Sequence, residues 1–155
     1  MARIKNFYEK TKQREYKNPF SEPLFLKFEI NEEEIRDGTV TFRYIPGKEV
    51  ARADGELGKG TVATLVDAIT HFAVIAFQGK TDWTLSVQCE SIYMKPIRAG
   101  CKLVLKGTVH KIGATISFTK AEIRDESTGE LLAYGKQTIG LVVKAPQGTA
   151  HKAKL

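Results

Sequence analysis

The chain has 155 residues, of which 42% are hydrophobic and 27% charged, a composition typical of one globular domain. No run of about 18 apolar residues predicts a membrane span, and the N-terminal segment lacks the apolar core of a secretory signal. The two cysteines, Cys89 and Cys101, have no metal-binding or redox spacing. We therefore expect reduced thiols and an intracellular protein, either cytoplasmic or mitochondrial.

The net charge of +6 lies in the two ends of the chain. Residues 1–22 form a basic N-terminal extension of charge +3, and residues 144–155 form a basic C-terminal tail of charge +3. The domain between them, residues 23–143, has fifteen basic and fifteen acidic side chains. The tails are either simply solvated or bind an acidic partner such as RNA, a phospholipid surface or another subunit.

Two strands and one helix are predicted in the first half. Alternating apolar residues predict strands at 24–30 and 39–46, followed by a loop over 47–60. A helix is expected to begin at Thr61, its candidate cap, and to end near Gln78. It is apolar almost all round, which predicts burial on most sides.

Four strands are predicted in the second half, and glycines supply the turns between them. Gly135 and Gly140 within the last strand suggest a bend or a bulge. Short connections favour four antiparallel neighbours. The expected class is α+β, a single domain whose antiparallel sheet curves around one long central helix, with strands at 83–94, 101–111, 115–125 and 131–143.

Asp67 interrupts the apolar helix, and the glycine-rich GELGKG loop precedes that helix. A buried carboxylate needs hydrogen-bond partners or a catalytic role. His71, four residues further along, lies on the same helix face. Asp67 therefore has two possible roles: it is a structural residue held by His71, a serine or a neighbouring subunit, or it is a catalytic residue. Free backbone N–H groups at the helix start could hold an oxyanion. The loop lacks phosphate-loop spacing, and no metal motif is present.

GTVATLVDAITHFA, LSVQCESIYMKPIRAG and the TGELLAYGK ending resemble the hotdog-fold acyl-CoA thioesterases. The resemblance covers residues 24–140, and ATLVD is its most specific part. These thioesterases are related to 4-hydroxybenzoyl-CoA thioesterase and to phenylacetate-pathway thioesterases. The likeness is greatest to the small eukaryotic group called thioesterase superfamily member two, or acyl-CoA thioesterase thirteen.

The resemblance implies a thioesterase site shared between the subunits of a dimer, often within a dimer of dimers. Asp67 would act as general base or nucleophile, and Ser86 would orient the water. The backbone N–H groups of Lys59 and Gly60 would hold the thioester oxygen. Coenzyme A, as part of the substrate, would bind basic residues, which the resemblance places at Lys111, Lys95 and Arg98. No separate cofactor or metal is implied.

The loop departs from the family pattern, because Gly58-Lys59-Gly60 stands where the family has His-Gly-Gly. Lysine lacks the conformational freedom that glycine gives a backbone near a substrate. Three functions therefore remain open. The chain is an active acyl-CoA thioesterase, a pseudoenzyme with a structural role in a larger assembly such as a mitochondrial one, or a non-catalytic binder of acyl-CoA or acyl carrier.

Overall fold

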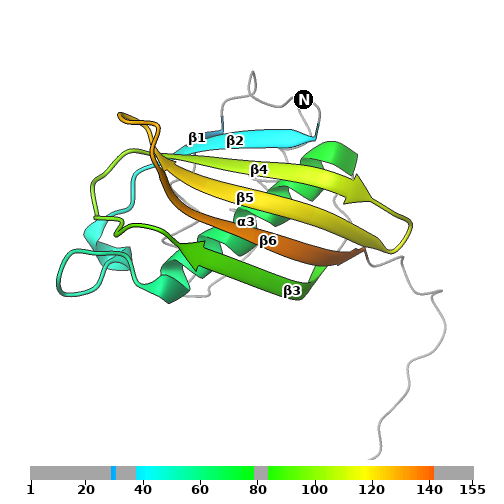
Figure 1. The fold of residues 1–155 in the computed structure, drawn as a ribbon, viewed down its shortest axis with the longest axis horizontal. Helices are drawn as coiled ribbons and strands as arrows, with labels where there is room; N and C mark the ends of the chain where they lie inside the picture. Colours follow the sequence, from blue (N-terminus) through cyan, green and yellow to red (C-terminus); the bar gives the residue numbers. More distant parts are fainter. Residues whose placement is uncertain (1–28, 31–37, 79–83, 142–155) are drawn as a thin grey trace, which may run out of the picture.

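The structure is a computed structural model and describes residues 29–30, 38–78 and 84–141. The predicted tails, 1–22 and 144–155, lie outside the described residues, as does most of the strand expected at 24–30. A six-stranded antiparallel sheet curves around one long helix (Figure 1). The expected fold class is thereby confirmed. The elements in chain order are β1 (Glu29–Ile30), β2 (Thr39–Tyr44), the 3-10 turn η2 (Lys48–Val50), α3 (Lys59–Gln78), β3 (Thr84–Tyr93), β4 (Leu103–Ile112), β5 (Ile116–Asp125) and β6 (Leu131–Leu141).

The strand order corrects one expectation. The sheet runs β1-β2-β4-β5-β6-β3, so β4, β5 and β6 are neighbours as expected, but β3 lies beyond β6 and away from β4. Residues 94–102 carry the chain across the domain and are tied to the loop before α3, through Leu57 N–H to Ile97 O at 2.8 Å and Ala99 N–H to Gly55 O at 3.0 Å. The short connection after β3 allowed β3 to pair either with β4 or with β6. The long-range hydrogen bonds of residues 94–102 favour the observed pairing with β6.

Helix α3 begins two residues earlier than expected. The N–H of Val62 donates to Gly58 O at 3.1 Å, so Gly58 is the N-cap and Lys59 the first helical residue. Thr61 is not the cap, because its hydroxyl donates to Val50 O at 3.3 Å. By length and composition α3 could cross a membrane, but it packs against the sheet as the core helix of the domain.

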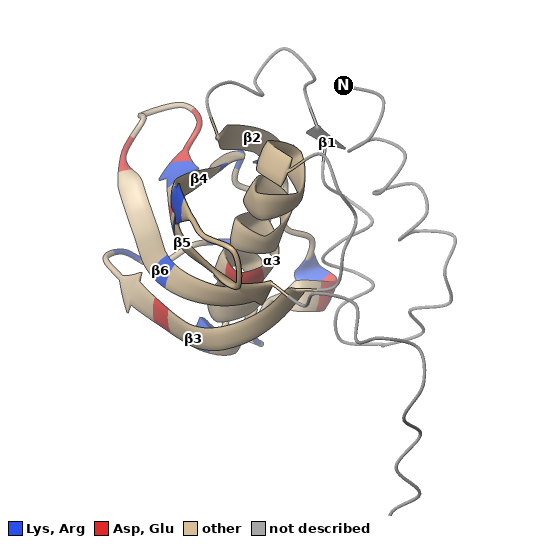
Figure 2. Cartoon of the chain, turned by 90° about the vertical axis from the view of Figure 1, so that its right-hand side faces the viewer, with Lys and Arg blue, Asp and Glu red and all other residues tan. Residues whose placement is uncertain are grey.

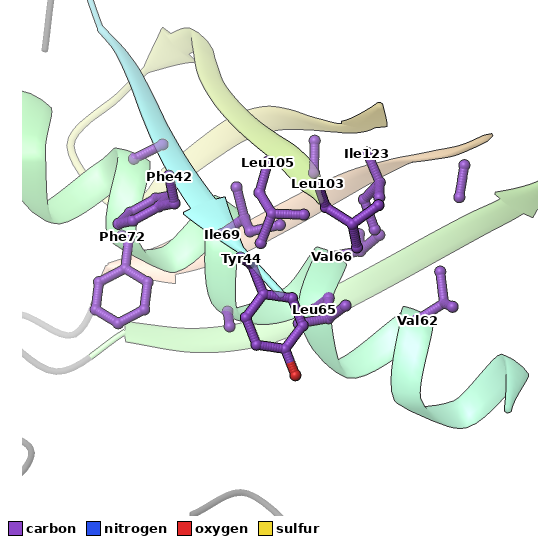
Figure 3. Packing of buried hydrophobic residues seen from close by; sticks show 14 of the residues in the cluster. Phe42, Tyr44, Val62, Leu65, Val66, Ile69, Phe72, Leu103, Leu105 and Ile123 are labelled. Carbon is purple, nitrogen blue, oxygen red and sulfur yellow. The ribbon is translucent and has the colours of Figure 1, made fainter. Parts of the chain in front are cut away.

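The core lies between α3 and the concave face of the sheet (Figure 3). Leu65, Ile69 and Phe72 project from the helix, and the Phe72 ring lies 5.4 Å from the ring of Phe42 on β2. Burying side chains of this size stabilises the fold by about 1.5–3 kcal/mol each. The helix is therefore held firmly, which fixes the position of any polar residue it carries.

The sequence suggested a bend or a bulge at Gly135 and Gly140, but both glycines are paired in register with β3 and with β5. The register shifts along β6 fall elsewhere, where Val87 is the extra residue on β3 and Leu132 the extra residue on β6. A β-carbon at Gly135 would overlap the Val66 side chain of α3 and the carbonyl oxygen of Glu90. The glycine therefore lets the helix approach the sheet closely.

Candidate active site

Asp67 lies in the middle of α3, at the point where the helix faces β6 and the edge strand β3. It is the one acidic residue of the helix, and an acidic segment accordingly marks α3 in Figure 2. Its side chain is 43% exposed, so the expectation that it is buried is wrong for the single chain. The helix buries its apolar faces in the sheet and leaves this carboxylate at the boundary of the core.

Ser86 is one hydrogen-bond partner of Asp67. Its Oγ donates to Asp67 Oδ1 at 2.6 Å. This contact exists because β3 pairs with β6 at the sheet edge, which brings the start of β3 alongside the middle of α3. The two residues named together by the family resemblance are therefore in direct contact.

Gln137 on β6 is a further partner that the sequence interpretation missed. Its Nε2 lies 2.5 Å from Asp67 Oδ1 and 2.8 Å from Ser86 Oγ, and it donates toward both. The residue is 3% exposed. Its signal in the sequence is a polar residue at an inward position of the strand, between Gly135 and Ile139, where an apolar residue is expected.

His71 completes the cluster, as its spacing from Asp67 predicted. Its Nε2 lies 3.5 Å from Asp67 Oδ1 and 3.0 Å from Ser86 Oγ, and its Nδ1 lies 2.6 Å from Thr84 Oγ1. Because Ser86 gives its single hydrogen to Asp67, it can only accept from His71, so Nε2 of His71 carries a hydrogen. His71 is thus a hydrogen-bond donor to the serine and not its base.

The surroundings of Asp67 favour its ionised form. Partial burial would raise the pKa of Asp67, but hydrogen bonds from His71, Ser86 and Gln137, with the electrostatic attraction of His71, outweigh burial and hold that pKa at about 2. All these donors lie at Oδ1. Among the described residues none donates to Oδ2, so one oxygen of an ionised carboxylate is available to a ligand or a water molecule.

The predicted oxyanion donors lie at the start of the same helix. Lys59 and Gly60 occupy the first turn of α3, where backbone N–H groups have no partner within the helix. Gly60 and Asp67 are about 10 Å apart along the helix axis, at 1.5 Å per residue. Lys59 is held at this turn by Tyr93, whose hydroxyl donates to Lys59 O at 2.9 Å and whose ring lies 5.7 Å from Lys59 Nζ.

The basic residues expected to bind coenzyme A are not gathered in one chain. Lys95 pairs with Glu130, which directly precedes β6, and Arg98 lies 3.9 Å from Glu56 in the loop before α3. Lys111 is exposed at the far end of β4, about 26 Å along the strand from Leu103, at 3.3 Å per residue. One subunit therefore does not present them as a single phosphate site.

The architecture of one long helix wrapped by an antiparallel sheet defines a hotdog-fold protein. A family model of the thioesterase superfamily matches residues 57–132, the segment that contains α3 and the strand carrying Ser86. The matched segment is 76 of the 155 residues, so the chain is similar to this superfamily over about half of its length.

The similarity extends to named relatives. Acyl-coenzyme A thioesterase 13 of Homo sapiens is 34% identical over 91 residues, which are 59% of this chain and 64%, less than two thirds, of the human protein. The crystal structure of thioesterase superfamily member 2 from Mus musculus superposes with a TM-score of 0.72 at 24% identity, covering 90% of this chain and 97% of that one. A hypothetical thioesterase from Streptococcus pneumoniae, solved with coenzyme A, gives a TM-score of 0.65 at 23% identity over 74% of this chain and 88% of that one.

Proposed function

We propose that the chain is an acyl-CoA thioesterase that hydrolyses an acyl-CoA thioester to a free acid and coenzyme A. The observation that carries the proposal is the ionised Asp67, with Oδ1 held by three side chains and Oδ2 open. A carboxylate in this state can take a proton from an attacking water or attack the thioester carbon itself. The named human relative and the coenzyme A in the Streptococcus pneumoniae structure support this substrate class.

The second half of the proposed site is the first turn of α3. The backbone N–H groups of Lys59 and Gly60 lie at the positive end of the helix dipole and would stabilise the oxyanion that forms when the thioester is attacked. Since these groups lie about 10 Å from Asp67 in the same chain, one thioester carbon cannot meet both. We therefore propose that the loop of one subunit works with Asp67 and Ser86 of another.

Strand β3 supports a dimer. It is ten residues long and, among the described strands, pairs with β6 alone. Leu85 is 60% and Val87 66% exposed, although strands of this length with an open edge are usually protected by charge or cover. Pairing of β3 with β3 of a second copy would satisfy the free backbone groups and cover the surface beside Asp67.

The test is hydrolysis of acyl-CoAs from acetyl to palmitoyl by the unmodified chain and by Asp67→Asn, released thiol being measured. Asparagine keeps the size of the side chain and removes its charge, and circular dichroism checks that the fold is retained. We expect turnover on part of the series and its loss in Asp67→Asn. Equal turnover by both proteins, or none by the unmodified chain, would contradict the proposal.

The altered loop favours one alternative, a hotdog subunit with a structural role. Lys59 lies on Tyr93 and replaces the glycine that the family has near the substrate, and the basic tails suit binding to a larger assembly, including a mitochondrial one. This alternative predicts no binding of acyl-CoA in calorimetry. Binding without turnover would instead indicate a non-catalytic acyl-CoA binder, with Lys111, Lys95 and Arg98 as the basic residues to test for contact with coenzyme A.

A further inference from the structure

The Asp67 carboxylate fixes the amide of Gln137 in one orientation, and the Thr70 hydroxyl on the other side, which can donate or accept, is compatible with that orientation. The Asp67 carboxylate can only accept hydrogen bonds, so the side of the amide that faces it must be the NH2 group. The oxygen Oε1 then faces Thr70, whose hydroxyl donates to it. Thr70 is fully buried and lies on α3, one turn from Val66, whose carbonyl oxygen is 3.0 Å from the same hydroxyl.

Turning this amide over would be costly. Oε1 would then lie against the oxygen of a carboxylate, in a place where 3% exposure leaves little access for water. Helix and sheet thus hold Gln137 between Thr70 and Asp67 and leave it no alternative arrangement.

The same contacts determine how Asp67 is turned. Ser86 and Gln137 both donate to Oδ1, and each is carried by a different strand, β3 and β6. A carboxylate held at one oxygen by donors from two directions cannot rotate to exchange its oxygens without breaking both bonds. Oδ2 therefore stays the oxygen that neither Ser86 nor Gln137 engages.

We propose that Gln137 is a positioning residue, which holds the Asp67–Ser86 pair so that Oδ2 of Asp67 is the oxygen presented to the thioester or to the attacking water. This inference deepens the proposed thioesterase function. Gln137 itself touches neither substrate nor water in this role, and it acts through Asp67 and Ser86.

The experiment compares Gln137→Met, Gln137→Glu and a control, Gln78→Met. Methionine keeps the length of the side chain and removes both amide groups. Gln78 is the last residue of α3, about 16 Å along the helix axis from Asp67, so its replacement tests for general effects of the same change. We expect Gln137→Met to lower kcat about 10²-fold, the loss that a misplacement of about 1 Å can cause, with little change in KM. Gln78→Met should keep the kcat of the unmodified chain.

The Gln137→Glu variant adds a readout that a merely structural role would not change. The introduced carboxyl group would lie against Asp67, and two carboxyls so close share one proton. While protonated, the new group can donate to Asp67 as the amide does. We expect the kcat of Gln137→Glu to be highest at low pH and to fall as the pH rises and the two carboxyls lose their shared proton. The pH profiles of the unmodified chain and of Gln137→Met should lack this fall.

The carboxyl carbon of Asp67, followed by NMR in protein labelled with ¹³C-aspartate, tests the proposal without turnover. The pKa of Asp67 should be about 2 in the unmodified chain and should rise in Gln137→Met but not in Gln78→Met. An unchanged pKa and an unchanged kcat in Gln137→Met would overturn the positioning role. If no acyl-CoA is hydrolysed while the pKa still rises, the proposed function fails and the positioning of Asp67 by Gln137 stands.

Discussion

Gly135 of β6 and Val66 of α3 lie so close that a β-carbon at position 135 would overlap the valine side chain. The same contact distance sets the separation of α3 from the strand that carries Gln137. The packing of helix on sheet beside the candidate site therefore depends on Gly135, as it does further along α3 on Gly107 of β4, where a β-carbon would overlap Ile69.

Gly135→Ala should destabilise the fold by about 1–3 kcal/mol, the usual effect of overpacking a filled core, because neither Val66 nor the Glu90 backbone can move freely. Urea denaturation measures the change. Gly140→Ala is the matched control in the same strand, since a β-carbon there meets Val87 Cγ2 at 3.4 Å, an ordinary contact. Equal stabilities of the two variants would contradict the packing described.

Lys59→Pro tests the oxyanion donor at the start of α3. Proline at the first helical position is compatible with the helix and removes the N–H, whereas Lys59→Ala keeps the N–H and removes the side chain. We expect Lys59→Pro to lower kcat by about 10²–10³-fold and Lys59→Ala to change it little. Hydrolysis of the best acyl-CoA of the series is the measurement. A loss of the same size in both variants would assign the effect to the lysine side chain.

The depressed pKa of Asp67 predicts how stability changes with pH. The folded-state pKa of about 2 lies below the ordinary 3.8, so the carboxylate contributes stability that is fully present above the higher value and is lost as the pH falls through the lower one. The difference in free energy of unfolding between the unmodified chain and Asp67→Asn should therefore be constant near neutral pH and shrink between about pH 4 and pH 2. Thermal denaturation of both proteins between pH 7 and pH 2 measures this difference. A difference in free energy of unfolding that stays constant down to pH 2 would show that the donors do not hold Asp67.

Val87→Lys should weaken the proposed dimer. Val87 is 66% exposed in the open edge strand β3, and lysine is the residue that commonly prevents strands from pairing at such edges. Phe118→Lys is the control, because Phe118 is 47% exposed on β5, which already has neighbours on both sides. Light scattering after gel filtration should show a smaller species for Val87→Lys alone. Dissociation by Phe118→Lys instead would place the interface on the face of the sheet.

The sequence by itself determined the elements and their chemistry. Apolar periodicity located the helix and strands to within a few residues, because side-chain burial repeats with the geometry of each element. The acid in the apolar helix marked Asp67, and its spacing indicated His71 as a partner. The pairing of Asp67 with Ser86 came from resemblance to a family, since no local pattern links residues on different elements.

Only the tertiary structure decided where β3 lies. Short connections fit a hairpin with β4 as well as the observed position beyond β6, and the choice depends on hydrogen bonds between residues distant in the sequence. That position brings Ser86 to Asp67, while the packing of β6 on α3 sets Gln137 between Asp67 and Thr70. A buried glutamine in a strand shows its partners only when helix and sheet are packed, because its hydrogen bonds reach across elements and not along the chain.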